Sequence, residues 1–174
     1  ENASGDWISF LDSDDLWNHN KLESVVGYIQ KNKGIDLVCH SLIAIEGPKE
    51  TLLNPFKNFN NKIDPFLSLY RGNCLYTSAL TVKKSILYQA GLFDNILPSA
   101  QDYDLWLRLG MINKIKMGFI EGPLSTHIGR DGNITSNIES RLQDMLEIGR
   151  KYYVELKKVS KVPKIDRIRF EGRV

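Results

Sequence analysis

Hydrophobic positions along the first third of the chain change from a continuous run to a helical period. Residues 6–11 are nearly all apolar, which is typical of a buried strand inside a parallel sheet covered on both faces. After the polar stretch that follows, the segment from about Asn18 to Lys31 carries an apolar set at helical spacing: Leu22, Val25, Val26 and Ile29. The chain therefore opens with a strand, a polar loop and an amphipathic helix that ends before Gly34.

The rest of the pattern continues this mixture of strands and helices. It predicts strands at residues 36–45, 74–82 and 115–120, a helical turn at 65–70, helices at 84–90 and 101–109, and a long helix at 134–156. Two polar stretches, 47–61 and 123–133, are predicted to be loops. We expect one α/β domain over residues 1–156, followed by a tail at 157–174.

Composition narrows the class of protein. With 174 residues, of which 42% are hydrophobic, the chain can form one domain with a substantial core. A formal net charge of +2 lacks the strong basic field of most nucleic-acid binders, so no nucleic-acid partner is expected. Cys39 and Cys74 are too few for a disulfide scaffold and lack zinc-site spacing. We predict that both are reduced and buried, in a cytoplasmic protein.

The two ends of the sequence carry further expectations. No run approaches the roughly 20 apolar residues of a membrane span, and no signal-peptide pattern opens the chain. The chain starts without an initiator methionine and enters a strand almost at once, which suggests a start partway through a domain. Residues 157–174 contain seven basic and two acidic side chains, typical of a solvated terminus or of contact with anionic lipid.

Three carboxylates, Asp12, Asp14 and Asp15, directly follow the first predicted strand. Like charges at this spacing repel and raise one another's pKa unless a cation lies between them. Mg²⁺ and Mn²⁺ prefer oxygen ligands, so Asp12 and Asp14 on either side of the small Ser13 are candidate metal ligands. A loop at the carboxyl end of a strand is also where open α/β sheets bind ligands. The alternative is a simple turn with a helix cap.

A second acidic site is predicted at the start of the helix at 101–109. Asp102 lies in its first turn, where the helix dipole favours a negative charge. Asp104 and Arg108 are one turn apart and are expected to pair, and Trp106 is expected to be buried.

Three segments together carry a family resemblance: FLDSDDLW at 10–17, GLFD at 91–94 and QDYDLWLRL at 101–109. In residue identity and order these segments resemble the GT-A fold glycosyltransferases of family 2, over residues 3 to about 130. The resemblance implies a Rossmann-like α/β fold with a mixed central sheet flanked by helices. It also implies inverting transfer of a sugar from a nucleotide-diphosphate sugar to a hydroxyl of a glycan or lipid-linked acceptor, in polysaccharide or cell-envelope biosynthesis. The expected donor is UDP-linked.

The resemblance also assigns roles to individual residues. The implied cofactor is Mn²⁺ or Mg²⁺, held by Asp12, Asp14 and His127, with Asp12 also near the donor ribose. Asp102 corresponds to the catalytic base, and Arg130 to a contact with the donor phosphates. For His127 the alternative is a surface-loop histidine without a ligand.

The family's opening strand and its following aspartate-rich segment, which hold the nucleotide base, have no counterpart in this sequence. We therefore expect half of a donor site, weak donor binding by this chain alone, and an exposed sheet edge that favours homo-oligomers. The basic tail would allow peripheral contact with the inner face of a membrane.

Two other interpretations remain open at this point. Haloacid-dehalogenase phosphatases also end a strand on Asp-x-Asp, but they need a small β-branched residue where Leu16 stands. A catalytically silent α/β module that acts through its surface is the other alternative. Metal-dependent binding of a sugar nucleotide would separate a silent module from an enzyme.

Overall fold

The long strand β3 (Leu37–Glu46) forms the centre of the fold, and its first six residues are all buried. We describe a computed structural model that covers residues 2–60, 62–129 and 138–158. Within them a sheet has the strand order β1-β5-β3-β6-β2, and β4 adds a further antiparallel pairing to β3. The other strands are β1 (Trp7–Ser9), β2 (Leu16–Trp17), β4 (Lys49–Leu53), β5 (Leu80–Lys83) and β6 (Met117–Ile128). β3 and β6 are parallel, and the other pairs are antiparallel.

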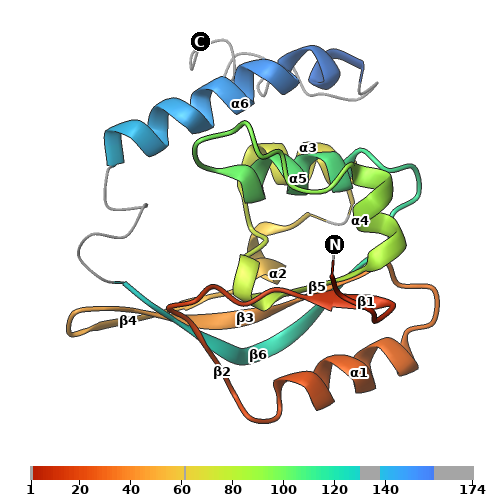
Figure 1. Ribbon diagram of the computed structural model, residues 1–174, viewed down its shortest axis with the longest axis vertical. Helices are drawn as coiled ribbons and strands as arrows, with labels where there is room; N and C mark the ends of the chain where they lie inside the picture. The colour runs from red at the N-terminus through yellow and green to blue at the C-terminus, as the bar shows by residue number, and fades with distance from the viewer. Residues whose placement is uncertain (1, 61, 130–137, 159–174) are drawn as a thin grey trace.

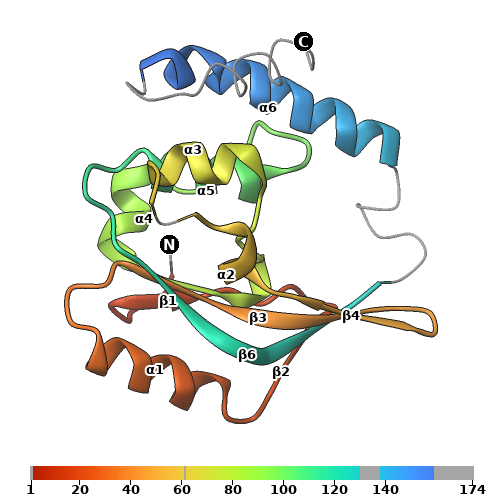
Figure 2. The same ribbon diagram turned by 180° about the vertical axis from the view of Figure 1, so that it is seen from behind.

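Helices cover both faces of this sheet in layers. Figure 1 shows α1 on one face and α3, α4 and α5 on the other, and Figure 2 shows the same arrangement from behind. In both views α6 lies in an outer layer, over α3 and α5 and away from the sheet. The helices are α1 (Lys21–Lys31), α2 (Pro55–Asn58), α3 (Pro65–Arg71), the 3-10 helix η1 (Thr77–Ala79), α4 (Lys84–Ala90), α5 (Gln101–Gly110) and α6 (Ile138–Lys158).

Local sequence explains where the helices beside the sheet begin and end. Asp64 caps α3 by accepting a hydrogen bond from the Leu67 amide at 3.1 Å, and Pro65 follows at the first helical position. α4 ends at Gly91, whose φ of +88° is a left-handed conformation that glycine adopts without steric cost. The α3–α5 contact is close, because a Cβ at Gly110 would lie 2.9 Å from the Phe66 Cα.

An aromatic group fixes the end of β1 to α5. The ring of Phe10 lies 5.6 Å from Phe93 and 5.9 Å from Trp106, both edge-on, and Trp106 is fully buried as predicted. The chain passes from Phe10 directly to the acidic loop. The apolar core therefore sets the distance between that loop and α5.

The first strand differs from its prediction as a buried strand of a parallel sheet. β1 is a half-buried strand with one neighbour among the described residues, β5, to which it runs antiparallel. The apolar run is explained by packing on one side, where Ile8 and Phe10 contact the core. β1 lies at one edge of the sheet in the described part of the chain, which is consistent with the expected exposed sheet edge.

The sequence predicted a loop at 47–61, but its described residues, 47–60, contain a strand and a short helix. Gly47, at φ +58°, turns the chain into β4, which pairs with β3 as a hairpin, and α2 follows after the Asn54 cap. Four of the five residues of β4 are exposed. The hairpin is polar because this part of it extends into solvent, and a hydrophobic pattern therefore fails to reveal it.

β6 is also longer than its prediction, since it continues through much of the predicted loop at 123–133. Residues beyond Gly122 keep pairing with β3 as far as Ile128 opposite Ile45. The register shifts on either side of Ser41, where the extra residues lie on β6, and this irregularity accommodates Pro123, which has no amide hydrogen to donate. Residues 130–133 of that predicted loop, 134–137 of the predicted long helix and 159–174 of the predicted tail lie outside the described residues.

Both cysteines are unpaired and buried, as predicted. Burial raises the pKa of the Cys39 thiol to about 12 and that of Cys74 to about 11, so both are protonated at neutral pH. His40 is buried in β3 with its Nδ1 2.8 Å from the Ser41 carbonyl, and burial lowers its pKa to about 4. His40 is therefore a neutral side chain packed inside the sheet. No helix among the described residues is long and apolar enough to cross a membrane.

Lys21, at the start of α1, is a fully buried lysine that the sequence did not flag. Its ammonium group lies 3.8 Å from the centre of the Trp17 ring and 3.3 Å from the Thr81 hydroxyl, which in turn bonds Ser9. Burial lowers the pKa of Lys21 to about 8. These contacts join the start of α1 to Thr81 of β5 and to Trp17 of β2, which follows the acidic loop.

We expect Lys21 to make the protein more stable as pH rises above 8. Between about pH 8 and the ordinary lysine value of 10.5, the unfolded chain binds a proton at this position that the folded chain has lost. The free energy of unfolding then rises by at most about 1.4 kcal/mol per pH unit. Urea unfolding at pH 7.5 and 9.5 should show this gain in the wild type and not in Lys21→Met. Lys31→Met, at the exposed end of α1, is the matched control, and an equal gain in all three proteins would refute the assignment.

Candidate functional site

The acidic loop begins where β1 ends and is held there by its own backbone. The Asp15 amide donates to the Asp12 carbonyl at 3.1 Å, which closes a tight turn. The Asp12 amide donates to the Ser78 hydroxyl at 3.0 Å, and the Trp17 indole donates to the Ser78 carbonyl at 2.8 Å. Ser78 therefore fixes both the beginning and the end of the loop.

Asp102 lies beside the same short helix, η1. One of its carboxylate oxygens, Oδ2, is 3.5 Å from the Thr77 hydroxyl, and the other accepts a 2.7 Å hydrogen bond from the Tyr103 amide. Thr77 and Ser78 thus connect two acidic groups that are 90 residues apart in the sequence. The sequence did not identify either residue as functional, because both lie within the strand predicted at 74–82. Two neighbouring hydroxyl side chains are only a weak indication of a site.

The carboxylates are close enough to affect one another's ionisation. Partial burial raises the pKa of Asp12, and the negative charges of Asp15, Asp102 and Asp14 raise it further, while His127 lowers it. These influences place the predicted residues Asp12, Asp14, Asp102 and His127 in one region of the fold. A site with such excess negative charge favours a cation.

His127 lies near the end of β6 and not in the surface loop that the sequence predicted. Its Nδ1 is 2.8 Å from Oδ1 of Asp15, whose side chain is only 3% exposed. The short pairing of β2 with β6, which sets Leu16 opposite Thr126, brings these two residues together. Asp15 was not selected from the sequence, although it is part of the same acidic run.

The predicted metal ligands do not form a ready-made metal cluster. Among residues 2–60, 62–129 and 138–158, no three His, Cys, Asp or Glu side chains are grouped so that they could hold an ion. Arg130, the predicted phosphate contact, lies outside the described residues. The structure thus assembles the predicted acidic groups without a complete three-ligand metal centre.

The family model for glycosyl transferase family 2 matches residues 1–88, which include the acidic loop and η1. The chain belongs to glycosyl transferase family 2. This assignment removes the phosphatase alternative, because it places the aspartates of the acidic loop in a different family of enzymes.

Relatives of this family 2 chain are named as glycosyltransferases. It is 28% identical over 114 residues to an uncharacterized glycosyltransferase of Rickettsia felis, covering 63% of this chain and 19% of that protein. It is 29% identical over 119 residues to one from Methanocaldococcus jannaschii, covering 68% of this chain and 40% of that protein. The chain therefore spans less than half the length of these relatives.

Solved structures confirm the predicted GT-A fold for this family 2 chain. A crystal structure of S. aureus TarS, residues 1–349, in complex with UDP-GlcNAc matches with a TM-score of 0.67 at 18% identity. The match covers 92% of this chain and 45% of that one. A second crystal structure of TarS matches with a TM-score of 0.61 at 17% identity, over 92% of this chain and 26% of that one.

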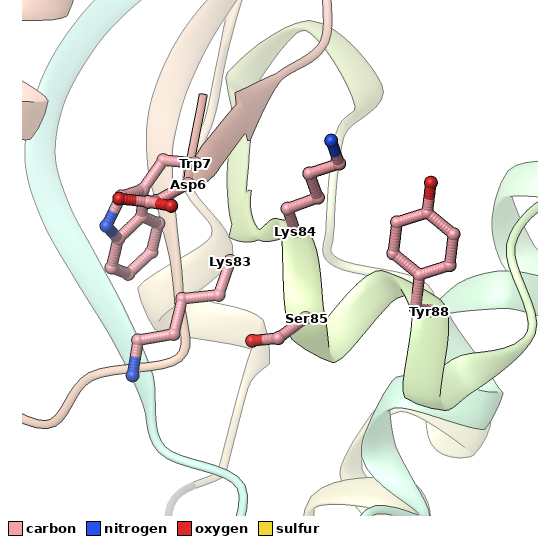
Figure 3. A pocket seen from close by; sticks show the side chains of 6 residues that line it. All are labelled: Asp6, Trp7, Lys83, Lys84, Ser85 and Tyr88. Carbon is pink, nitrogen blue, oxygen red and sulfur yellow. The ribbon is translucent and has the colours of Figure 1, made fainter. Parts of the chain in front are cut away.

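A pocket at the edge of β1 in this family 2 domain carries two lysines, drawn in Figure 3 with Trp7 and Tyr88. Lys83 is paired with Asp36 at 2.8 Å, and Lys84 donates to the Ala3 carbonyl at 2.5 Å. The residues that line this pocket do not include Asp12, Asp14, Asp102 or His127. The candidate active site is therefore the acidic loop together with Asp102.

Proposed function

We propose that the protein transfers a sugar from a nucleotide-diphosphate sugar to a hydroxyl group of a glycan or lipid-linked acceptor, with inversion at the anomeric carbon. The observation that carries this proposal is the bridge through η1. Ser78 holds the acidic loop at Asp12, and Thr77 holds Asp102, so a donor-binding group and a base lie on one short support. Membership of glycosyl transferase family 2 supports the reaction class.

In this proposal Asp102 is the general base. A carboxylate at the start of α5 can accept the proton of an acceptor hydroxyl while that oxygen attacks the anomeric carbon. Direct displacement needs no nucleophile from the enzyme. Thr77 and the Tyr103 amide, which contact the two Asp102 oxygens, hold the carboxylate in one orientation for this step.

We further propose that Asp12 and Asp14 bind Mn²⁺ or Mg²⁺ together with the donor diphosphate. The fit rests on the chemistry of the donor set, because hard oxygen ligands and mutual repulsion at Asp12 both favour a divalent cation. The ion would neutralise charge on the leaving diphosphate. We propose His127 as the third ligand, because the Asp15 carboxylate 2.8 Å from its Nδ1 would leave Nε2 for the ion.

UDP is the nucleotide that we propose for the donor. TarS, whose fold resembles that of this chain, has been crystallised in complex with UDP-GlcNAc. The acceptor proposal, the cytoplasmic location at the inner face of a membrane, membrane contact through residues 157–174 and homo-oligomer formation rest on the sequence alone.

Calorimetric titration tests this function. Full-length protein is titrated with UDP in the presence and absence of Mn²⁺, and UDP release from UDP-GlcNAc is then followed with candidate acceptors. We expect binding that requires the metal, and slow release of UDP even without the natural acceptor. Absence of nucleotide binding by these 174 residues would favour the silent-module alternative for this chain. Absence of binding also by a protein that includes the family's opening strand would contradict the glycosyltransferase proposal.

A further inference from the structure

Helix α6 contacts the segment that carries Asp102 on both sides of that residue. On the amino-terminal side, the Ser99 hydroxyl donates to the Asp144 carboxylate of α6. On the carboxyl-terminal side, Asp104 Oδ1 accepts hydrogen bonds from Tyr152 at 2.9 Å and from Lys151 at 2.8 Å. We infer that α6 positions the base of the proposed reaction, with Asp144 and Tyr152 as positioning residues. This inference rests on the proposed role of Asp102.

Asp104 is the stronger of the two attachments because its carboxylate is fully buried. Burial by itself would raise the pKa of Asp104, but hydrogen bonds from Lys151, Arg108 and Tyr152 lower it below the ordinary value. Arg108 binds the second oxygen at 2.9 Å and also donates to the Ala90 carbonyl at the end of α4. This ionised carboxylate therefore links α5 directly to α6 and, through Arg108, to α4.

The attachment at Ser99 supports a strained turn. Ala100, between Ser99 and α5, has a φ of +53°, a left-handed conformation that is sterically unfavourable for a residue with a Cβ atom. Such a conformation persists only where neighbouring contacts hold it. The Asp144 contact, together with the hydrogen bond from the Gln101 amide group to the Leu97 carbonyl, provides this support.

α6 is well placed to act on α5 without being part of the sheet. It lies in the outer layer in Figures 1 and 2. Among the residues of α6 whose burial is described, the buried ones follow a spacing of four and are Ile148, Tyr152 and Leu156. The Gly149 carbonyl accepts a 2.5 Å hydrogen bond from Tyr70 of α3. Removing one polar contact should therefore leave the apolar packing of α6 and the sheet intact.

Single substitutions in full-length protein test this inference. Asp144→Ala removes the contact with Ser99, and Tyr152→Phe removes one hydroxyl from Asp104. Each variant should lower kcat about tenfold with the KM for the donor unchanged, because the donor is held by the acidic loop and not by α5. Amide hydrogen exchange at residues 100–104 should become about tenfold faster. Glu147→Ala, which removes an exposed carboxylate from the same helix, is the control and should change neither quantity.

A double-mutant cycle shows whether α6 acts through Asp102. In an Asp102→Asn background, Asp144→Ala should cost no further activity, since a positioning residue has no effect once its target is gone. A further tenfold loss in that background would overturn the inference. So would wild-type kcat and wild-type amide exchange in both α6 variants.

Two further measurements distinguish a loss of positioning from a loss of folding stability, and a failure of this inference from a failure of the proposed function. If Asp144→Ala lowers the melting temperature, Ser99→Ala removes the same contact from outside α6, and Ser99→Thr should restore it. If Asp102→Asn is as active as the wild type, the proposed base is wrong. If amide exchange is unchanged in the α6 variants, α6 does not hold the segment that carries Asp102. The two failures therefore give different results.

Discussion

Asp102→Asn is expected to lower kcat about 10²- to 10⁴-fold, the usual contribution of a general base. Asparagine has nearly the same shape as aspartate, and its side-chain oxygen can still accept the hydrogen bond from the Tyr103 amide that starts α5. What it loses is the capacity to take a proton. Because the acidic loop is unchanged, the metal-dependent affinity for UDP should stay within about threefold of the wild type.

The measurement is steady-state transfer together with calorimetry on the same preparation. Asp6→Asn, at the exposed start of β1 and away from the site, is the matched control and should retain wild-type kcat. A kcat for Asp102→Asn within threefold of the wild type would remove the base assignment. A loss confined to donor affinity would instead move Asp102 to a binding role.

Asp14→Ala is expected to remove most of the metal-dependent donor binding. A residue that only orients a metal ligand typically contributes about 10- to 100-fold in metal affinity, and we expect a direct ligand to contribute at least about 100-fold. Asp14 is half-buried on the acidic loop, and its charge acts on Asp12. Removing it should therefore weaken Mn²⁺ binding without disturbing the turn that the Asp12 and Asp15 backbones form.

Titration of UDP with and without Mn²⁺ measures this effect. Glu23→Ala, which removes an exposed carboxylate from the first turn of α1, serves as the control and should bind like the wild type. If Asp14→Ala still binds UDP with full metal dependence, the ion is held elsewhere, and the assignment of Asp14 is wrong.

Much of the site was predictable because its residues occur in short, distinctive segments. FLDSDDLW and QDYDLWLRL predicted both the family and the two acidic groups, and the helix at 101–109 was confirmed as α5. The pairing of Asp104 with Arg108 was predictable in the same way, since residues four apart lie on one side of a helix. The roles of Asp12, Asp14, Asp102, His127 and Arg130 stay predictions.

Contacts between distant segments were not predictable in this way. The link between Thr77 and Asp102 spans 25 residues, and the link between Asp15 and His127 spans 112. The sequence at 123–133 predicts a loop around His127, whereas pairing with the long β3 continues the strand past Gly122 and Pro123. The polar hairpin at β4 was missed because exposed strands lack an apolar face.

The sequence by itself determined the family, the mixed α/β class and the acidic residues, because local segments of strand, loop and helix encode them. Only the tertiary structure decided that η1 supports both acidic groups, that Lys21 is buried behind the acidic loop, and that α6 contacts the Asp102 segment on both sides. The physical reason is that burial and hydrogen bonding depend on which surfaces meet. Hydrophobic periodicity specifies the buried face of each element, but the partner of that face is fixed by packing and strand register.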